Sequence, residues 1–286
     1  MRIVDIHFQN RRLLPGDILA GVVEIKTNKP FGCNRVVLKL KGKEHTEYSA
    51  GENRVSDDKT IIGRVFRVSE GKTIPEGITR IPFSIDLPKQ LSPTYEGTYG
   101  RIEYTLEAVV EVNWTLDPKC KKEFRVLQNR PPYIEDSIGL EPSTITDDEL
   151  QVQLDEKCLR LDTGINVQFK VKERSRVRGV RFEIIREEDA VCRSRTLNRK
   201  SAIVRKIYPI ASDDFGRWLD INIGEKWRYH LPFLSGLFKI TYFLKVTLDV
   251  GLDFDPSIEF PLKFSDIVPE RDVLEEIAID LGFREW

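Results

Sequence analysis

The residues of this chain that most often carry metal or catalytic chemistry are its histidines and cysteines. The three histidines have no second histidine or cysteine at ligand spacing: His7, His45 and His230. The four cysteines are dispersed, with no C-x-x-C pair: Cys33, Cys120, Cys158 and Cys192. Zinc ligands usually show paired spacing. The pattern therefore predicts no bound metal and four reduced thiols that are mostly buried.

The short motifs that mark nucleotide-binding or hydrolytic sites are missing from the sequence, which has no G-x-G-x-x-G, P-loop, G-x-S-x-G or H-E-x-x-H. Carboxylates do cluster at Glu187-Glu188-Asp189, but we expect this stretch to be a loop without a partner base. The sequence thus predicts no catalytic residue and no cofactor. A site assembled from distant segments is invisible to motif reading, so a sandwich-fold hydrolase or carbohydrate-binding module stays open as an alternative.

Charge is unevenly distributed along the chain. The overall net charge is −1, which argues against a surface built for nucleic acid. From Lys170 to Lys206, however, the sequence has thirteen basic and five acidic residues, which gives a net charge of +8. From Asp253 to Trp286 the sequence has ten acidic and three basic residues, which gives a net charge of −7.

Two interpretations of the basic stretch are open. It is either a solvated strand face or an anion-binding surface for phosphorylated partners, acidic peptides or lipid headgroups. The candidate anion- or partner-binding residues include a second basic pair near the N-terminus: Arg11, Arg12, Arg174, Arg176, Arg178, Arg193 and Arg195.

The elements that must position these residues are strands, because apolar residues alternate with polar ones along most of the chain. The longest stripe runs through Ile102, Tyr104, Leu106, Ala108, Val110 and Val112. Successive side chains of a strand point to opposite faces, so each such run is a half-buried strand. Turn signals such as Pro15-Gly16-Asp17 separate the runs, and no helical period intervenes. The expected fold class is all-β, with antiparallel sandwiches.

The strand pattern occurs twice in the same order. Positions 16, 36, 104 and 124 of the first half are matched by positions 164, 180, 242 and 260 of the second, at offsets of 148, 144, 138 and 136. Between the halves lies Pro131-Pro132, which stiffens the chain and marks a linker. We therefore expect two tandem immunoglobulin-like β-sandwich domains, at residues 1–130 and 147–266.

Residues 267–286 form a separate acidic tail. Apolar residues recur there at helical spacing, which predicts a short amphipathic helix. Two interpretations are open: the tail is frayed and solvated, or it docks on the body of the protein or on a neighbouring chain through Leu274, Ile277, Leu281 and Trp286. The sequence has no secretory signal and no apolar stretch of spanning length. It predicts a cytoplasmic protein that can act peripherally at membranes.

Several motifs of the first half occur in a specific order. Pro15-Gly16-Asp17, followed by Gly21, opens the series. More specific is the order of three later motifs: Ile81-Pro82-Phe83-Ser84-Ile85-Asp86-Leu87-Pro88, then Leu91-Ser92-Pro93-Thr94-Tyr95-Glu96-Gly97, then Gly100-Arg101-Ile102-Glu103-Tyr104. These motifs resemble the arrestin family and its relatives, the vacuolar-sorting subunits of retromer-type coats. The resemblance covers roughly residues 1–266, more loosely in the second half.

The resemblance implies a non-enzymatic protein-interaction adaptor or scaffold in protein sorting, trafficking or signalling. Its implied partners are other proteins: cargo, a receptor tail, or coat and scaffold subunits. An anionic membrane surface is a further candidate. A retromer-type coat subunit is the nearest alternative, because Glu259-Phe260-Pro261-Leu262-Lys263-Phe264 looks closer to those subunits. Pro131-Pro132-Tyr133 lacks one residue of the ligase-recruiting P-P-x-Y motif, so that role is not carried over.

Overall fold

The computed structural model describes residues 2–113, 115–129, 143–146, 149–154, 158–173, 176–224, 226–251 and 255–265. These residues form twenty strands and one short 3₁₀ helix, η1 (Ser212–Asp214). By contacts the chain divides into two compact units. The first comprises Met1–Asn129, Glu188–Arg199 and Phe233–Ile240, and the second comprises Arg130–Glu187, Lys200–Pro232 and Thr241–Trp286.

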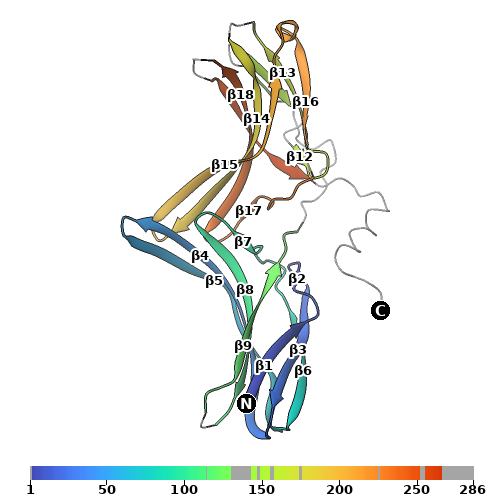
Figure 1. The fold of residues 1–286 in the computed structure, drawn as a ribbon, viewed down its shortest axis with the longest axis vertical. Coiled ribbons are helices and arrows are strands. Elements are labelled where there is room, and N and C mark those ends of the chain that lie inside the picture. The colour runs from blue at the N-terminus through green and yellow to red at the C-terminus, as the bar shows by residue number, and fades with distance from the viewer. Residues whose placement is uncertain are drawn as a thin grey trace, which may run out of the picture. The chain divides into compact units, whose positions relative to one another are not determined.

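Residues 2–126 form two sheets of the first unit (Figure 1). One sheet has the order β1-β3-β6, made of β1 (Arg2–Phe8), β3 (Ile18–Thr27) and β6 (Gly77–Asp86). The other has the order β2-β9-β8-β4-β5, made of β2 (Arg12–Leu13), β9 (Lys119–Val126), β8 (Gly100–Glu111), β4 (Phe31–Ala50) and β5 (Asn53–Ile74), with β7 (Tyr95–Glu96) paired to β8.

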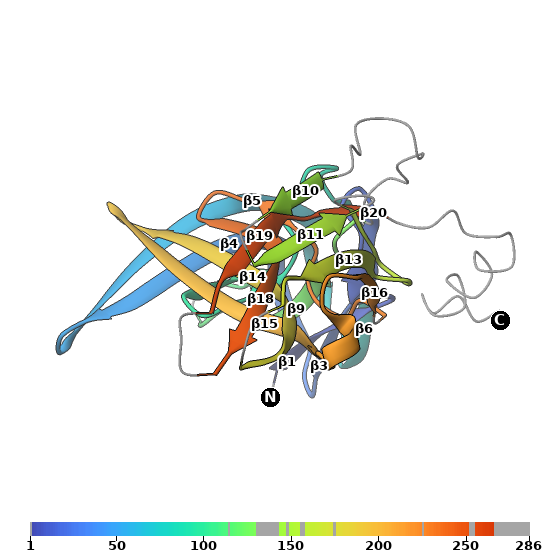
Figure 2. The ribbon, with the colours of Figure 1, turned by 90° about the horizontal axis from the view of Figure 1, so that it is seen from above.

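Residues from 143 onward form three more sheets, seen from above in Figure 2. The first has the order β10-β11-β13-β16, made of β10 (Ser143–Thr146), β11 (Leu150–Leu154), β13 (Ile165–Val171) and β16 (Trp218–Ile223). The second has the order β15-β14-β18-β17, made of β15 (Arg195–Pro209), β14 (Val177–Cys192), β18 (Phe238–Val250) and β17 (Phe233–Leu234), with β19 (Ser257–Pro261) on β18. The third pairs β12 (Cys158–Arg160) with β20 (Lys263–Ser265).

The core consists of the alternating residues that the sequence analysis placed on one face. Tyr104, Leu106 and Ala108 of β8 are at most 1% exposed, and so are Ile240 and Leu244 of β18. Such burial is the main favourable term in folding. The predicted all-β class with antiparallel sheets is therefore confirmed. The predicted tail helix lies outside the described residues, and no described helix is long and apolar enough to cross a bilayer.

Several hydrogen bonds of the first half recur in the second half between residues whose numbers are higher by 138. The Tyr104 hydroxyl donates to the Ser92 carbonyl at 2.6 Å, and the Tyr242 hydroxyl donates to the His230 carbonyl at 2.5 Å. An Asp-Pro pair is repeated in the same way. The Val112 N–H donates to Asp117 at 3.0 Å, and the Val250 N–H donates to Asp255 at 3.0 Å. Matching bonds at matching positions support a duplicated scheme.

Two short parallel pairs also repeat, at an offset of 138 between β9 and β20 and of 146 between β2 and β12. Leu13 of β2 pairs with Val126 of β9, and Leu159 of β12 pairs with Phe264 of β20. This register corrects one match of the sequence analysis. Phe124 pairs with Tyr104, while the Leu262 N–H donates to the Tyr242 carbonyl. Leu262, and not Phe260, is thus the equivalent of Phe124, because each of the two lies opposite the corresponding tyrosine.

We expect Tyr104 and Tyr242 to remain protonated in the folded protein well above pH 10, the ordinary tyrosine pKa. Burial raises the pKa of both hydroxyls. Because the folded-state pKa exceeds the unfolded one, their contribution to stability is fully present below about pH 10. It is lost as the pH rises from there through the raised pKa.

Tyrosinate absorbance during alkaline titration measures this. The variants Tyr104→Phe and Tyr242→Phe should give the same native titration curve as the wild type up to the onset of unfolding. A smaller amplitude in either variant near pH 10 would show that its tyrosine titrates normally.

Candidate functional site

The two N-terminal arginines of the predicted anion-binding set are exposed beside β2. The Arg11 guanidinium lies 5.8 Å from the centroid of the Phe8 ring, a weakly attractive cation–π arrangement at an exposed site. The backbone N–H of Arg12 donates to Asn10 Oδ1 at 2.8 Å. Neither guanidinium has a carboxylate partner among the described residues, so both can face a ligand.

Arg193 and Arg195 stand at the tip of the β14–β15 hairpin, in the segment Glu188–Arg199 that belongs to the first unit. Arg193 has a φ of 55° at the turn, and its N–H donates to Asp57 Oδ2 at 2.8 Å. The Arg195 guanidinium lies 5.2 Å from the centroid of the Tyr48 ring. Both arginines therefore already contact their own unit, and the acidic neighbour Asp57 weakens the site for an anion.

Arg176 and Arg178 lie in the second unit. Arg176 has a φ of 68°, and its carbonyl accepts the Gly251 N–H at 2.9 Å. The six described arginines of the predicted set are therefore divided between the two units: Arg11, Arg12, Arg193 and Arg195 in the first, and Arg176 and Arg178 in the second. Arg174 and the four predicted tail-docking residues lie outside the described residues: Leu274, Ile277, Leu281 and Trp286. Their roles stay predictions.

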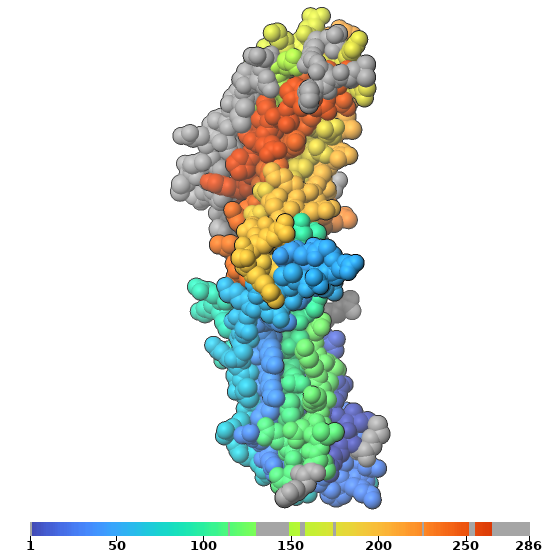
Figure 3. Space-filling view, turned by 90° about the vertical axis from the view of Figure 1, so that its left-hand side faces the viewer, coloured from blue at the N-terminus to red at the C-terminus, as the bar shows by residue number. Residues whose placement is uncertain are grey.

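A basic strand edge in the first unit was missed by the sequence analysis. β5 stands at the end of its sheet beside β4. Its residues 59–72 carry one acidic residue, Glu70, and four exposed cations: Lys59, Arg64, Arg67 and Lys72. Val65 among them is 65% exposed. The β4–β5 hairpin, in blue, is open to solvent on the face shown in Figure 3.

This edge combines two properties that favour a peptide ligand. A strand at the end of a sheet has unpaired N–H and C=O groups along its outer side. The net positive charge of residues 59–72 favours an acidic partner over a basic one. The long hairpin geometry comes from the pairing of β4 and β5 over most of their length, from Phe31↔Ile74 to Ala50↔Asn53. Sequence reading could have found it by counting charge along this strand.

A histidine with acidic neighbours lies on the same hairpin. His45 Nδ1 is 2.6 Å from Asp58 Oδ1, and Nε2 is 3.4 Å from Glu47 Oε2. Lys43 Nζ lies 2.9 Å from Asp58. The hydrogen bond from His45, and then that from Lys43, hold the pKa of Asp58 below its ordinary value. The cluster is a network of ion pairs without a nucleophile.

The four cysteines are free thiols, and three of them are buried. Burial raises the pKa of Cys33 and Cys120, and the neighbouring Asp5 raises that of Cys120 further. A raised pKa keeps a thiol protonated and poorly nucleophilic. Among the described residues, no group of three or more histidine, cysteine or carboxylate side chains is placed to hold a metal ion.

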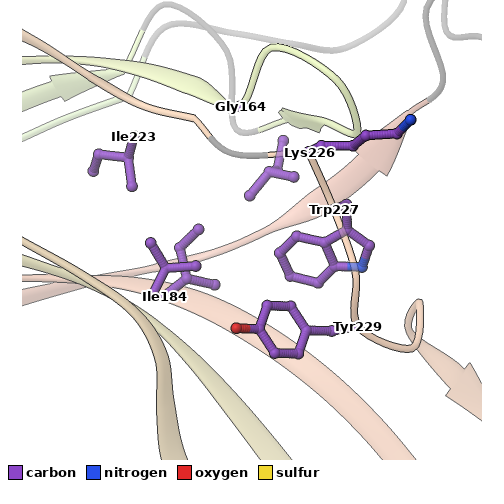
Figure 4. A pocket seen from close by; sticks show the side chains of 8 residues that line it. Gly164, Ile184, Ile223, Lys226, Trp227 and Tyr229 are labelled. Carbon is purple, nitrogen blue, oxygen red and sulfur yellow. The ribbon is translucent and has the colours of Figure 1, made fainter.

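The second unit holds a cavity of about 10 Å³, which is the size of one water molecule. Figure 4 shows Trp227 and Tyr229 on one side and Ile184 and Ile223 on the other. The Trp227 ring packs against Phe264 at 4.9 Å between centroids, and its Nε1 has no hydrogen-bond partner among the described residues. The cavity is too small for a substrate, and we interpret it as imperfect packing.

The prediction that Glu187-Glu188-Asp189 is a loop is wrong. All three residues lie within β14, and Glu188 is 0% exposed. The backbone N–H of Thr98 donates to both of its carboxylate oxygens, at 2.9 and 3.0 Å. The Tyr99 N–H donates at 3.1 Å, and the Tyr95 hydroxyl at 3.0 Å. Backbone N–H groups and one hydroxyl thus compensate for the burial of this charge.

Glycine at position 97 makes this contact possible. A Cβ at Gly97 would lie 2.5 Å from Glu188 Oε1 and 2.6 Å from the Tyr95 ring. The loop that binds the carboxylate is the segment Tyr95-Glu96-Gly97 with the following two residues, which the sequence analysis singled out only for its resemblance. Its pairing with Glu188 could have been found from the acidic residue at an inward-facing strand position.

Residues 4–130 match the protein family described as "Arrestin (or S-antigen), N-terminal domain". Arrestin domain-containing protein 17 of Caenorhabditis elegans is 32% identical over 129 residues, which cover 39% of this chain and 30% of that protein. Arrestin domain-containing protein 1 of Rattus norvegicus and of Mus musculus is 21% identical over 130 residues, which cover 44% of this chain and 30% of each relative. The chain thus matches less than a third of the length of these curated relatives.

Proposed function

Because residues 4–130 match the arrestin N-terminal domain family, we propose that this chain is a non-enzymatic adaptor that binds an acidic, extended segment of another protein. The observation that carries the proposal is the basic outer edge of β5. An extended segment can add to such an edge through main-chain hydrogen bonds. Carboxylates of the segment would then face Arg64 and Arg67, which gives the edge its selectivity.

The proposed partner is the cytoplasmic tail of a membrane protein, bound as cargo or as a receptor. Such tails are extended in the free state, so they can pair along an edge without first unfolding. In this role the chain acts in the cytoplasm, at the membrane surface, and links the tail to sorting or signalling proteins. The charge of the edge steers the encounter and makes it salt-dependent, while the main-chain pairing supplies the affinity.

The test is a comparison of two charge-reversal variants in affinity purification from native cells, followed by mass spectrometry. Arg64→Glu with Arg67→Glu changes the β5 edge, and Lys119→Glu with Lys121→Glu is the control on β9, another strand of the same sheet. We expect the edge variant to retain membrane-protein partners in amounts about tenfold lower than the wild type. Each lost charge contact to a docked carboxylate costs up to about 1 kcal/mol, and two such contacts are lost.

The control variant should retain these partners at the wild-type level. Equal retention by both variants would refute binding at the β5 edge. A chain that retains no membrane protein in any form would refute the adaptor role.

A further inference from the structure

Two buried glutamates occupy equivalent positions of the two halves. Glu44 lies on β4 and is 1% exposed, and Glu188 lies on β14 and is 0% exposed. Their offset is 144, the same as that between Val36 and Val180. A buried carboxylate is costly unless donors compensate for its lost hydration. An acidic residue at the same inward position of both halves is therefore a feature with a structural reason.

The donors to these glutamates are also equivalent, but they are exchanged. Glu188 accepts the Thr98 N–H, and Glu44 Oε1 accepts the Gly236 N–H at 3.0 Å. Thr98 and Gly236 are related by the offset of 138 that governs the repeated hydrogen bonds. Each glutamate thus holds the loop of the other half, and all four residues belong to the first unit. We call Glu44 and Glu188 the crossed carboxylates.

The bonds next to the crossed carboxylates are not exchanged. The Glu47 N–H donates to the Tyr99 carbonyl at 2.7 Å, and the Val191 N–H donates to the Leu237 carbonyl at 2.8 Å. These pairs obey the same two offsets but stay within their own half. The exchange therefore involves the two carboxylates and not these two backbone bonds beside them.

The crossed carboxylates are unequally satisfied. Both oxygens of Glu188 accept hydrogen bonds. Glu44 Oε2 is buried and has no partner among the residues that the structure describes. A buried carboxylate oxygen without a hydrogen-bond partner raises the free energy of the folded state, because it has lost the hydrogen bonds that water would give it. The Glu44 contact is therefore the weaker of the two.

A cation stands close to the weaker contact. Lys59 is the cross-strand partner of Glu44 on β5. Its side chain lies against the loop, since a Cβ at Gly236 would be 2.5 Å from Lys59 Nζ. Lys59 is exposed, so its ammonium can move without breaking a core contact. Gly236 itself is exposed, and Leu234 in the same loop is 78% exposed.

We propose that the crossed carboxylates form an unequal latch. Glu188 holds the loop at Thr98 continuously, whereas Glu44 exchanges between the Gly236 N–H in a closed state and the Lys59 ammonium in an open state. In the open state the segment Phe233–Leu237 is released. Phe233 leaves its T-shaped contact with Tyr95, where the ring centroids are 5.2 Å apart. Lys59 is the residue that sets the fraction of open molecules.

Amide hydrogen exchange on the full-length protein tests the latch. In the wild type, we expect amides 234–237 to exchange at least about tenfold faster than amides 98–99, because Glu44 accepts one hydrogen bond from their loop whereas Glu188 accepts four from the other. In Lys59→Gln, exchange of amides 234–237 should slow by about two- to fivefold, since an exposed ion pair contributes up to about 1 kcal/mol. The matched control is Lys72→Gln, an exposed lysine of the same strand, which should leave exchange unchanged.

A second background distinguishes charge exchange from a local packing effect. In Glu44→Gln the carboxylate that attracts the ammonium is gone, so adding Lys59→Gln should produce no further slowing. The latch is refuted if the two loops exchange at the same rate, or if Lys59→Gln and Lys72→Gln behave alike. It is also refuted if Lys59→Gln acts equally strongly in the Glu44→Gln background.

Discussion

Replacing Tyr104 with alanine is expected to lower the free energy of unfolding of the first unit by roughly 3–5 kcal/mol, as for other large-to-small core changes. Tyr104 is 1% exposed, and its ring lies 5.8 Å from that of Phe124 between centroids. It also fills the space beside Gly42, where a Cβ would lie 2.5 Å from the tyrosine ring. Alanine would leave a cavity that the surrounding strands cannot close.

The variant Tyr104→Phe is the matched control, since it keeps the ring and removes only the hydrogen bond to Ser92. That bond contributes about 1 kcal/mol. Urea denaturation followed by tryptophan fluorescence and by circular dichroism measures both changes. If Tyr104→Ala costs no more than Tyr104→Phe, the ring does not carry the core packing that we assign to it.

Replacing Glu188 with alanine is expected to cost roughly 3–5 kcal/mol of the same free energy. The substitution leaves the N–H groups of Thr98 and Tyr99 and the hydroxyl of Tyr95 without their acceptor. Each buried unsatisfied donor costs about 1–3 kcal/mol. We also expect faster amide exchange at residues 98–99, because these N–H groups lose the acceptor that protects them.

The neighbouring carboxylate provides the control for this experiment. Glu187 lies on the same strand, is half-buried and has an ion pair with Lys200 at 3.8 Å. Exposed or half-exposed pairs contribute about 1 kcal/mol or less, so Glu187→Ala should change stability little. Equal losses for Glu187→Ala and Glu188→Ala would mean that the Glu188 contacts do not contribute as their geometry suggests.

Much of the fold could be predicted from the sequence, because alternation is a local signal. The stripe around Tyr104 sits on β8 and that around Tyr242 sits on β18, where the inward faces are buried. The repeated order of strands was also visible, because loop length changes an offset without changing the order of strands. The pairing register was harder to predict. Phe260 was matched to Phe124 in place of Leu262, because Phe260 and Leu262 are both apolar and point to the same face of the chain.

The candidate site was harder to predict, because it depends on contacts between distant segments. Glu188 continues the inward face of β14 together with Ala190 and Cys192, all 0% exposed. An acidic residue in that row interrupts the hydrophobic pattern, so a strand was mistaken for a loop. The basic stretch of residues 170–206 is visible in the sequence. Its described arginines nevertheless lie in different units, and strand alternation and turns point neighbouring side chains in different directions. Closeness in sequence did not give closeness in space.

The duplicated scheme has a consequence for how the chain folds. Two halves with matching registers offer each strand a wrong partner in the other half, and such mispairing is a common trap for repeat-containing proteins. Lys39 of β4 pairs with Glu107 of β8. At the equivalent positions the second half has Glu183 and Lys245, with the signs reversed. A nascent β4 that pairs with β18 would place Lys39 opposite Lys245, and like charges across a ladder are destabilising. This charge reversal favours pairing of each strand within its own half before the chain commits to a topology.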